Sequence, residues 1–407
     1  MSDVRAYASA LVEESLGLVK GHLERYPLPQ DFVDEASSVM RGGPTEDVGR
    51  PVLELRMAAL LASMRETALR EDGFFVRKAR WPGAAQFAVC LTHDVDNISR
   101  PSSHIWKTRS RFSLGDLLGG LLGVVPLYDN VRLISSREKA QGFRSSFYFL
   151  SQNYPLSEVR QTSDKIRMEG WDVGLHGDFG THDSLEKMNE AMSLFAAGLG
   201  FRPEGLREHY LKFDFGKSWQ VMESAGFNYD TTVGTNDRLG FKLGLSSPFH
   251  PPDGAWVPMN LLEVPLVLMD TTLWGYLKRS EAEGMADAMK ITGQVEEVEG
   301  LLTLLWHQEA VRMRGGRIYW KLLQEFKSRG CFVGSGAEVA RWWRARAVPL
   351  IKDGKLIRLG GDPPKDLVLR LDLAEGREPR VESGSVEGSG PSRLVKTAGR
   401  GLRIEVA

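Results

Sequence analysis

Residues 87–96 read FAVCLTHDVD, so a short apolar run passes directly into a cluster of polar and ionisable side chains. An apolar run of this length is typical of a strand that is buried on both faces of a parallel sheet. The cluster Thr92-His93-Asp94-Val95-Asp96 then lies at the carboxyl end of that strand. Because barrel-like α/β folds build their active sites at this end of the strands, the stretch predicts both a buried strand and a site.

Further apolar runs follow along the chain and alternate with amphipathic helical patterns. The predicted strands are Ser146–Leu150, Trp171–Leu175, Leu261–Met269, Leu301–Trp306 and Cys331–Val333. The predicted helices are Ser157–Glu169, Ser184–Leu199, Lys217–Ala225 and Ala282–Glu299. Buried strands that alternate with helices predict a parallel α/β sheet or barrel, which we place at residues 86–346.

The two ends of the chain differ from this central part. Residues 1–80 show apolar side chains at helical spacing and predict a helical N-terminal region. Residues 348–407 alternate apolar and polar side chains at Leu367–Leu373 and Leu402–Val406, on either side of a tract rich in glycine and serine. They predict a β-rich appendage or a partly disordered tail.

The composition argues against several classes of protein. The chain has 407 residues and a formal net charge of −1, which argues against nucleic-acid binding by bulk attraction to phosphates. Only two cysteines, Cys90 and Cys331, exclude a disulfide scaffold and a cysteine-rich zinc module. We find no signal peptide and no apolar run of about 20 residues that would span a membrane. We therefore expect a cytoplasmic protein, with peripheral membrane contact left open.

Ionisable residues also follow other apolar segments of the central part. These residues are three histidines, one acid and one arginine: His176, His209, His307, Asp230 and Arg207. Carboxylates and imidazoles together suit a borderline divalent ion such as zinc, with one position left open for water. One of the acids Asp94 and Asp96 can hold the metal while the other takes a proton from the water, and a histidine can protonate a leaving amine. The pattern predicts metal-assisted hydrolysis.

On these residues, the sequence resembles the polysaccharide deacetylases of the NodB-homology, carbohydrate esterase type. The resemblance covers roughly residues 86–335. The family's first motif is usually Thr-Phe-Asp-Asp-Gly, and here residues 92–96 stand in its place with the two acids one residue further apart. The resemblance implies a distorted (β/α) barrel that carries a divalent metal, for which we expect zinc.

The resemblance also implies roles for single residues. It makes Asp94 the catalytic base, Asp96 a metal ligand and His176 a second ligand. Arg207 corresponds to the arginine that orients the base. His307 corresponds to the general acid, and Asp230 to the acid that tunes it.

The third metal ligand departs from the family pattern. The family places this ligand four residues after the first histidine, where the chain has Gly180. The nearest histidine is His182, six residues after His176, and we take it as the predicted third ligand. His209 and Asp178 remain alternatives.

The resemblance implies a hydrolase that removes an acyl group, foremost acetyl, from an N-acylated saccharide or glycoconjugate by cleaving a linear amide C–N bond. One alternative is hydrolysis of a non-sugar C–N bond on the same scaffold. Another is a non-catalytic saccharide-binding or assembly protein with a degraded metal site, which the glycine at position 180 motivates. The oligomeric state is open.

Residues 100–141 form a long insertion between the first two predicted strands. The basic residues Lys107, Arg109 and Arg111 precede a run rich in leucine and glycine at residues 114–125. We favour a core helix interrupted by glycine. The alternative is contact with a lipid-linked saccharide at a membrane surface.

Overall fold

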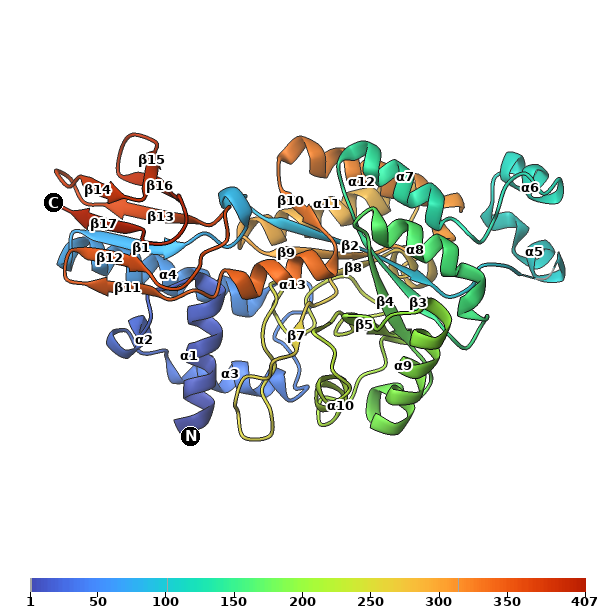
Figure 1. The fold of residues 1–407 in the computed structure, drawn as a ribbon, viewed down its shortest axis with the longest axis horizontal. Coiled ribbons are helices and arrows are strands. Elements are labelled where there is room, and N and C mark those ends of the chain that lie inside the picture. The colour runs from blue at the N-terminus through green and yellow to red at the C-terminus, as the bar shows by residue number, and fades with distance from the viewer. Residues whose placement is uncertain (1, 101, 314) are drawn as a thin grey trace.

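The computed structural model describes residues 2–100, 102–313 and 315–407. At its centre lies a curled parallel sheet (Figure 1). Its strands are β2 (Ala88–Val95), β3 (Ser146–Leu150), β4 (Asp172–Gly177), β5 (Gly205–Glu208), β6 (Tyr229–Asp230), β7 (Leu262–Glu263), β8 (Leu268–Met269), β9 (Leu301–Leu305) and β10 (Phe332–Gly334). They lie in the order β7-β6-β5-β4-β3-β2-β9-β8, and β10 pairs with the first half of β2.

One stretch of chain, residues 262–269, closes this sheet into a distorted barrel. Its first two residues form β7, which is parallel to β6, and its last two form β8, which is parallel to β9 at the other edge. Between them, the N–H groups of Val264 and Val267 donate to the carbonyl oxygens of Asp230 and Thr303. Because this segment pairs with both edges, neither edge is left without hydrogen-bond partners. The single strand predicted at 261–269 is in fact two short strands.

Helices cover the outside of the barrel, and α9 (Leu185–Leu199) shows how the sequence specifies them. The buried side chains of α9 recur at helical spacing on one face, at Met188, Ala191, Met192, Phe195 and Leu199. The helix ends at Gly200, whose φ of 85° suits glycine. The other helices around the barrel are α7 (Val131–Gln141), α8 (Arg160–Met168), α10 (Ser218–Ser224), α11 (Glu281–Glu297), α12 (Gly316–Arg329) and α13 (Gly336–Ala345). The predicted distorted (β/α) barrel is confirmed.

The N-terminal region is helical, and it also contributes a strand. Its helices α1 (Ser2–Leu16), α2 (His22–Arg25), α3 (Gln30–Met40) and α4 (Val52–Glu71) share one apolar core with the barrel. Buried Glu54 of α4 ties them to it, because its carboxylate accepts the N–H of Ser246 at 2.8 Å and pairs with Arg80 at 3.2 Å. After α4 the chain forms β1 (Phe74–Lys78), which pairs with a strand from the C-terminal part.

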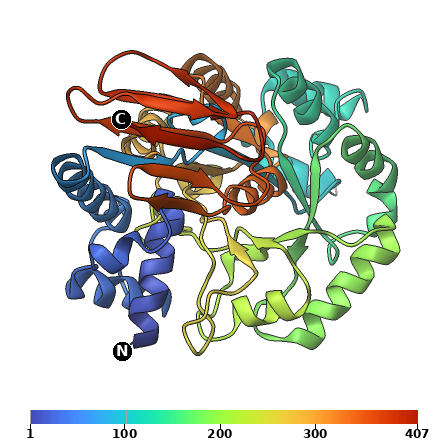
Figure 2. The same ribbon diagram turned by 60° about the vertical axis from the view of Figure 1, so that its left-hand side comes forward.

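The C-terminal residues form two antiparallel sheets at one end of the molecule (Figures 1 and 2). One sheet joins β1 to β13 (Val368–Leu373), β16 (Ser392–Thr397) and β15 (Gly384–Glu387) in that order. The other has the order β11 (Leu350–Asp353), β12 (Leu356–Leu359), β17 (Arg403–Val406) and β14 (Pro379–Glu382). Apolar side chains of both sheets share a core with Trp343 of α13. The predicted β appendage is confirmed.

Residues 102–125 protrude at the opposite end of the molecule (Figure 1). They form α5 (Ser102–Thr108), the 3₁₀ turn η2 (Arg109–Arg111) and α6 (Leu114–Leu121). Our favoured prediction of a core helix is wrong here, because Gly119 is the buried residue of α6 while Leu118 and Leu121 are exposed. Within the ranges that the structure describes, no helix is long and apolar enough to cross a bilayer.

Candidate active site

The end of β2 places two carboxylates on one side of the barrel mouth. Asp94 is the penultimate residue of β2, and Asp96 follows the strand by one residue. Residues two apart in extended chain point to the same side, so both acids reach the same neighbour. That neighbour is His176 of β4, whose Nε2 lies 3.5 Å from Asp94 Oδ2 and 3.2 Å from Asp96 Oδ1.

The orientation of the His176 ring is fixed from behind. Its Nδ1 lies 2.7 Å from the backbone carbonyl oxygen of Arg207 on β5, the strand that pairs with β4. A carbonyl oxygen only accepts, so Nδ1 carries the proton and Nε2 is directed at the two acids. The nearby carboxylates of Asp94 and Asp96 outweigh the opposing effect of burial and raise the pKa of His176. A cation at Nε2, either a proton or a metal ion, is therefore favoured.

His209 enters the same cluster from the turn after β5. It begins the short turn η5 (His209–Leu211), in which Tyr210 and Leu211 have φ of 58° and 51°. This left-handed turn redirects the chain directly after the strand. His209 Nε2 lies 4.0 Å from Asp96 Oδ2, and the ligand atoms of Asp96, His176 and His209 all lie within 4.8 Å of one another.

The chemistry of these three side chains fits a divalent metal ion. One carboxylate and two imidazoles are ligands that zinc accepts, and three protein ligands leave a position for water or substrate. Apart from each other at 3.2 Å, the buried atoms Asp96 Oδ1 and His176 Nε2 have no polar partner in hydrogen-bond geometry within the described part of the chain, which favours a ligand that engages both. Burial, together with the charge of His176, lowers the pKa of His209 to about 4, so its imidazole is neutral, the form that binds metals.

The structure separates the three candidates for the third ligand. His182 lies in the turn η4 (Thr181–Asp183), where its nearest charged partner is Asp183 at 3.9 Å, and it is not part of the ligand cluster. Asp178 is engaged elsewhere, because Ser151 Oγ donates to its Oδ2 at 2.7 Å. The geometry brings His209, and neither His182 nor Asp178, to Asp96 and His176.

Arg207 holds Asp94 from below the cluster. The guanidinium is fully buried, and its Nη1 donates to Asp94 Oδ1 at 3.1 Å and to Thr92 Oγ1 at 2.7 Å. Its other N–H groups donate to the carbonyl and the hydroxyl oxygen of Thr231 at 3.0 and 2.8 Å. Asp94 is thus held in a fixed orientation, with Oδ2 left facing His176.

Asp230 does not lie beside His307 as the resemblance implies. It is buried in β6, where it interacts with Thr232 and with the carboxyl of Glu263. Burial raises the pKa of Asp230 to about 6 and that of Glu263 well above its usual range, so this pair of acids shares protons in the barrel interior. The structure thus gives Asp230 contacts beneath the site, with the charge of Arg207 nearby.

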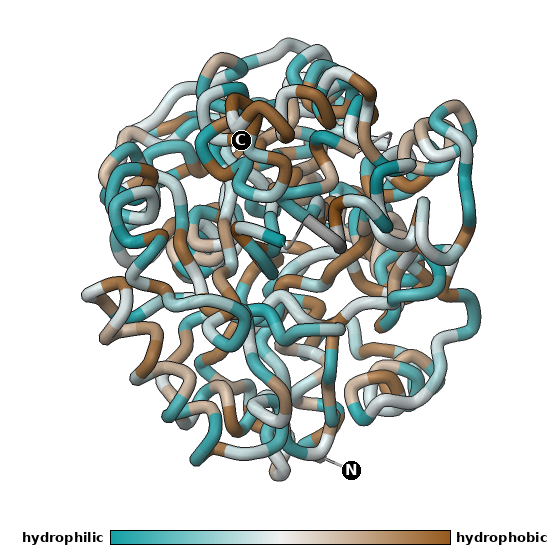
Figure 3. The backbone as a smooth tube through the Cα atoms, turned by 90° about the vertical axis from the view of Figure 1, so that its right-hand side faces the viewer, coloured by the Kyte–Doolittle hydropathy of each residue, from teal (hydrophilic) through white to brown (hydrophobic). Residues whose placement is uncertain are grey.

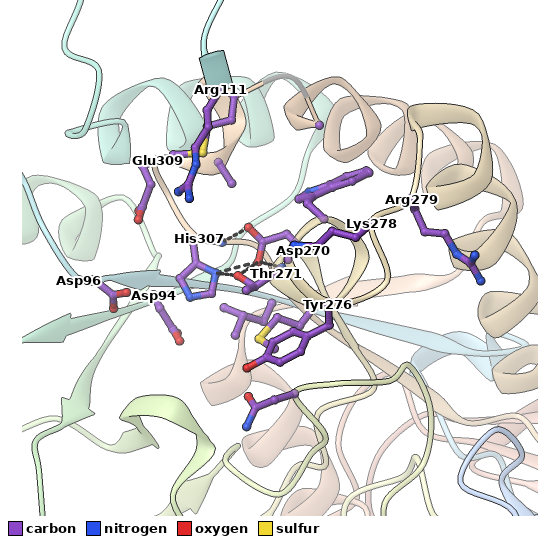
Figure 4. A pocket seen from close by; sticks show the side chains of 18 of the residues that line it. Asp94, Asp96, Arg111, Asp270, Thr271, Tyr276, Lys278, Arg279, His307 and Glu309 are labelled. Carbon is purple, nitrogen blue, oxygen red and sulfur yellow. Dashed lines mark hydrogen bonds and ion pairs between the residues drawn. The ribbon is translucent and has the colours of Figure 1, made fainter. Parts of the chain in front are cut away.

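His307 has a different carboxylate partner, Asp270, directly after β8 (Figure 4). The Nδ1 atom of His307 lies 2.7 Å from Asp270 Oδ1, and the backbone N–H of His307 donates to Asp270 Oδ2 at 3.2 Å. Burial opposes protonation, but Asp270 outweighs it and raises the pKa of His307 well above its usual value. Figure 4 shows the ring of His307 between Asp270 and the acids Asp94 and Asp96.

Two residues of this site, Asp270 and Glu309, were not predicted from the sequence. Asp270 follows Leu268 and Met269, so it carries the same signal as the other site residues, an acid directly after an apolar run. Glu309 lies two residues after His307 and lines the same pocket, and burial raises its pKa to about 7. No pattern in the sequence distinguishes Glu309 from a surface acid.

One cavity of about 860 Å³ lies at the carboxyl ends of the strands, and it is lined by the metal cluster, Asp94, the pair Asp270 and His307, and Glu309. This volume lies within the range of small-molecule sites. The outer wall carries the half-exposed aromatic rings of Tyr210 and Tyr276 and the indole of Trp274, together with Arg111 from the insertion. Tyr276 and Trp274 lie on a π-helical turn, η6 (Thr272–Tyr276), a local geometry that is frequent at functional sites.

Comparison with known proteins gives a likeness in fold. No family model matches the chain, and no curated protein matches it in sequence. Among solved structures, a protein from Mycobacterium smegmatis that has been assigned as a polysaccharide deacetylase shares 15% sequence identity, with 65% of this chain and 93% of that chain covered and a TM-score of 0.48.

Two further solved structures show the range of proteins with this likeness. PuuE allantoinase shares 17% identity, with 66% of this chain and 93% of that chain covered and a TM-score of 0.46. BA3943 from Bacillus anthracis, a CE4 family pseudoenzyme, shares 11% identity, with 62% of this chain and 65% of that chain covered and a TM-score of 0.37. At these identities the likeness concerns the fold alone.

Proposed function

We propose that this protein is a metal-dependent hydrolase that removes an acyl group, foremost acetyl, from an N-acylated saccharide. One observation carries the proposal. A single cavity holds a three-residue cluster that fits a metal ion, a carboxylate fixed beside it, and a protonated histidine on the opposite wall. These are the parts that amide hydrolysis requires: a site for an activated water, a base and an acid.

The metal cluster and Asp94 form the side of the cavity that prepares the attack. A divalent ion held by Asp96, His176 and His209 would lower the pKa of a water molecule and polarise the amide carbonyl. Asp94 would act as the base through Oδ2, because Arg207 occupies Oδ1. The buried guanidinium holds Asp94 in one orientation, which is what a general base needs.

His307 forms the side that releases the product. The nitrogen of a cleaved amide leaves as an amine only if it receives a proton. Asp270 holds His307 in the protonated state at neutral pH, and the ring faces the carboxylates across the cavity. His307 therefore acts as the general acid, and Asp270 takes the positioning role that the resemblance gave to Asp230.

The third ligand also bears on the alternative of a degraded metal site. That alternative rests on the glycine at position 180, where the family has a ligand. His209 offers an imidazole to the same cluster from another strand, so the ligand set has three members without position 180. This supports an active site over a degraded one.

Two features support a saccharide as the substrate. The motif resemblance points to polysaccharide deacetylases, and the cavity mouth presents two half-exposed tyrosine rings, Tyr210 and Tyr276. Exposed aromatic rings offer flat apolar surfaces with a polar tip, which suit the C–H faces and hydroxyls of a sugar ring. Trp274 adds a third ring to this wall.

The test is release of acetate by the full-length protein, reconstituted with zinc, from a panel of N-acetylated oligosaccharides. We expect turnover that the Asp94→Asn variant lacks, since the variant preserves the fold and the ligands. If no oligosaccharide yields acetate above the Asp94→Asn background while simple non-sugar amides are hydrolysed, the saccharide assignment is wrong. If neither kind of amide is cleaved by metal-loaded protein, the hydrolase assignment is wrong.

A further inference from the structure

The protruding segment of residues 102–125 carries an unusual share of the protein's exposed apolar surface. Figure 3 looks at the molecule from this end, and Figure 1 shows α5 and α6 standing away from the barrel. Of the fourteen exposed large apolar side chains among the described residues, six lie between positions 106 and 124. We call these six the apolar tip: Trp106, Leu114, Leu118, Leu121, Leu122 and Val124.

The outward direction of the apolar tip follows from the way the segment is attached. Its inner side packs as a small cluster of its own, in which Phe112, Leu127 and Tyr128 are buried and Met313 contributes from the barrel. Asp116 of α6 pairs with Arg312 at 3.0 Å and fixes the rotation of the helix. The leucines at 114, 118, 121 and 122 fall on the other side of α6 and face solvent. All six tip residues are more than half exposed, with Leu121 at 82%.

The apolar tip is bordered by positive charge that is not compensated. Lys107 and Arg109 have no ion-pair partner among the residues that the structure describes, whereas the side chain of Arg111 lines the acidic cavity. The acid of this segment, Asp116, is already paired with the barrel. The guanidinium of Arg109 lies 4.3 Å from the centre of the Trp106 ring, so a cation and an aromatic ring are presented together.

We propose that the apolar tip docks on the surface of an anionic lipid bilayer. Leucines on one helix face, a tryptophan and adjacent basic side chains are the composition of segments that lie in a membrane interface. Anionic headgroups supply the negative charge that Lys107 and Arg109 lack. A second copy of this chain is disfavoured as the occupant, because a symmetric pairing would bring two uncompensated basic sets together.

Docking would also orient the cavity. Arg111 ends the 3₁₀ turn within the basic border, and its side chain lines the cavity (Figure 4). The docked protein would therefore hold its cavity mouth near the bilayer surface, within reach of a molecule anchored there. Membrane docking itself does not depend on the proposed hydrolysis.

The experiment is co-sedimentation of the full-length protein with vesicles of phosphatidylcholine alone and with added phosphatidylglycerol. We expect binding to the anionic vesicles that exceeds binding to the neutral ones by at least tenfold and falls with added salt. The variant Leu121→Ser/Leu122→Ser should lose at least tenfold in binding to the anionic vesicles. The matched control Met168→Ser/Leu194→Ser removes two exposed apolar side chains from the barrel helices and should bind like the wild type.

Each other outcome overturns the proposal. Equal sedimentation with and without anionic lipid excludes the bilayer as the occupant, as does an equal loss in the control variant. A wild-type dimer that Leu121→Ser/Leu122→Ser converts to a monomer, without vesicle binding, assigns the face to self-association. Circular dichroism of both variants shows whether the barrel is folded, and acetate release by the same samples reports separately on the hydrolase.

Discussion

The two walls of the cavity use histidine in opposite ways. The Nδ1–H of His176 donates to a neutral backbone carbonyl, and its buried Nε2 is directed at Asp94 and Asp96. The Nδ1–H of His307 donates to the carboxylate of Asp270, and this ion pair raises the pKa of the ring. The partner on Nδ1 thus decides the role. A carbonyl sets up a nitrogen ligand, whereas a carboxylate sets up a proton donor.

The largest effect on turnover is expected at the metal wall, from Asp94→Asn. The amide cannot accept a proton, so we expect turnover to fall by about 10³–10⁴-fold, the upper part of the range for general acid–base catalysis. Because Asp94 is not in the ligand cluster, metal content measured by elemental analysis should stay at the wild-type level. Near-wild-type turnover would exclude Asp94 as the base.

A somewhat smaller effect is expected at the opposite wall, from His307→Gln. Water can replace part of a general acid, so we expect turnover to fall by about 10²-fold. Substrates with better leaving groups need less protonation, and the loss should shrink for an acyl ester compared with the matching amide. An equal loss for both substrates would show that His307 does not protonate the leaving group.

The pairing of Asp270 with His307 is tested by Asp270→Asn. Activity requires protonated His307 and is lost as the pH rises through its pKa. Because Asp270 raises that pKa, its removal should shift the alkaline limb of the kcat profile to lower pH. Below the shifted limb, kcat should stay within about tenfold of the wild type, since the histidine is then protonated without help. An unchanged alkaline limb would contradict the pairing, and Asp230→Asn serves as the comparison because Asp230 lies away from His307.

The smallest effect is expected from His182→Ala, outside both walls. This histidine is not part of the ligand cluster, so metal affinity and turnover should change by less than about threefold, as for an ordinary surface substitution. Zinc titration against a competing chelator measures the affinity. A loss of more than about tenfold would restore His182 as a ligand and remove His209 from the proposed set.

The sequence predicted what depends on local patterns. Apolar runs located the parallel strands, and Ser146–Leu150 matches β3 residue for residue. Because the carboxyl ends of parallel strands meet at one barrel mouth, side chains as distant in sequence as Asp94 and His307 could be assigned to one site. Both do line the same cavity.

What the sequence did not predict depends on turns and on very short strands. His209 reaches the metal cluster because a left-handed turn at Tyr210 follows β5, and nothing in its spacing from His176 reveals that turn. Asp270 follows an apolar run, but its place beside His307 depends on the pairing of the two-residue strand β8 with β9. Long-range pairing decides both positions, and periodicity does not report it.

The most direct test of the account is zinc binding by the purified, chelator-treated protein and by its His176→Ala, His209→Ala and His182→Ala variants. If Asp96, His176 and His209 form one metal site, the wild type and His182→Ala take up a single equivalent of zinc with similar affinity. His209→Ala then binds at least about 100-fold more weakly, since even indirect partners of metal ligands are worth 10–100-fold, and His176→Ala shows no specific binding. Zinc uptake by His176→Ala that equals the wild type, or no uptake by the wild type, would contradict the central claim.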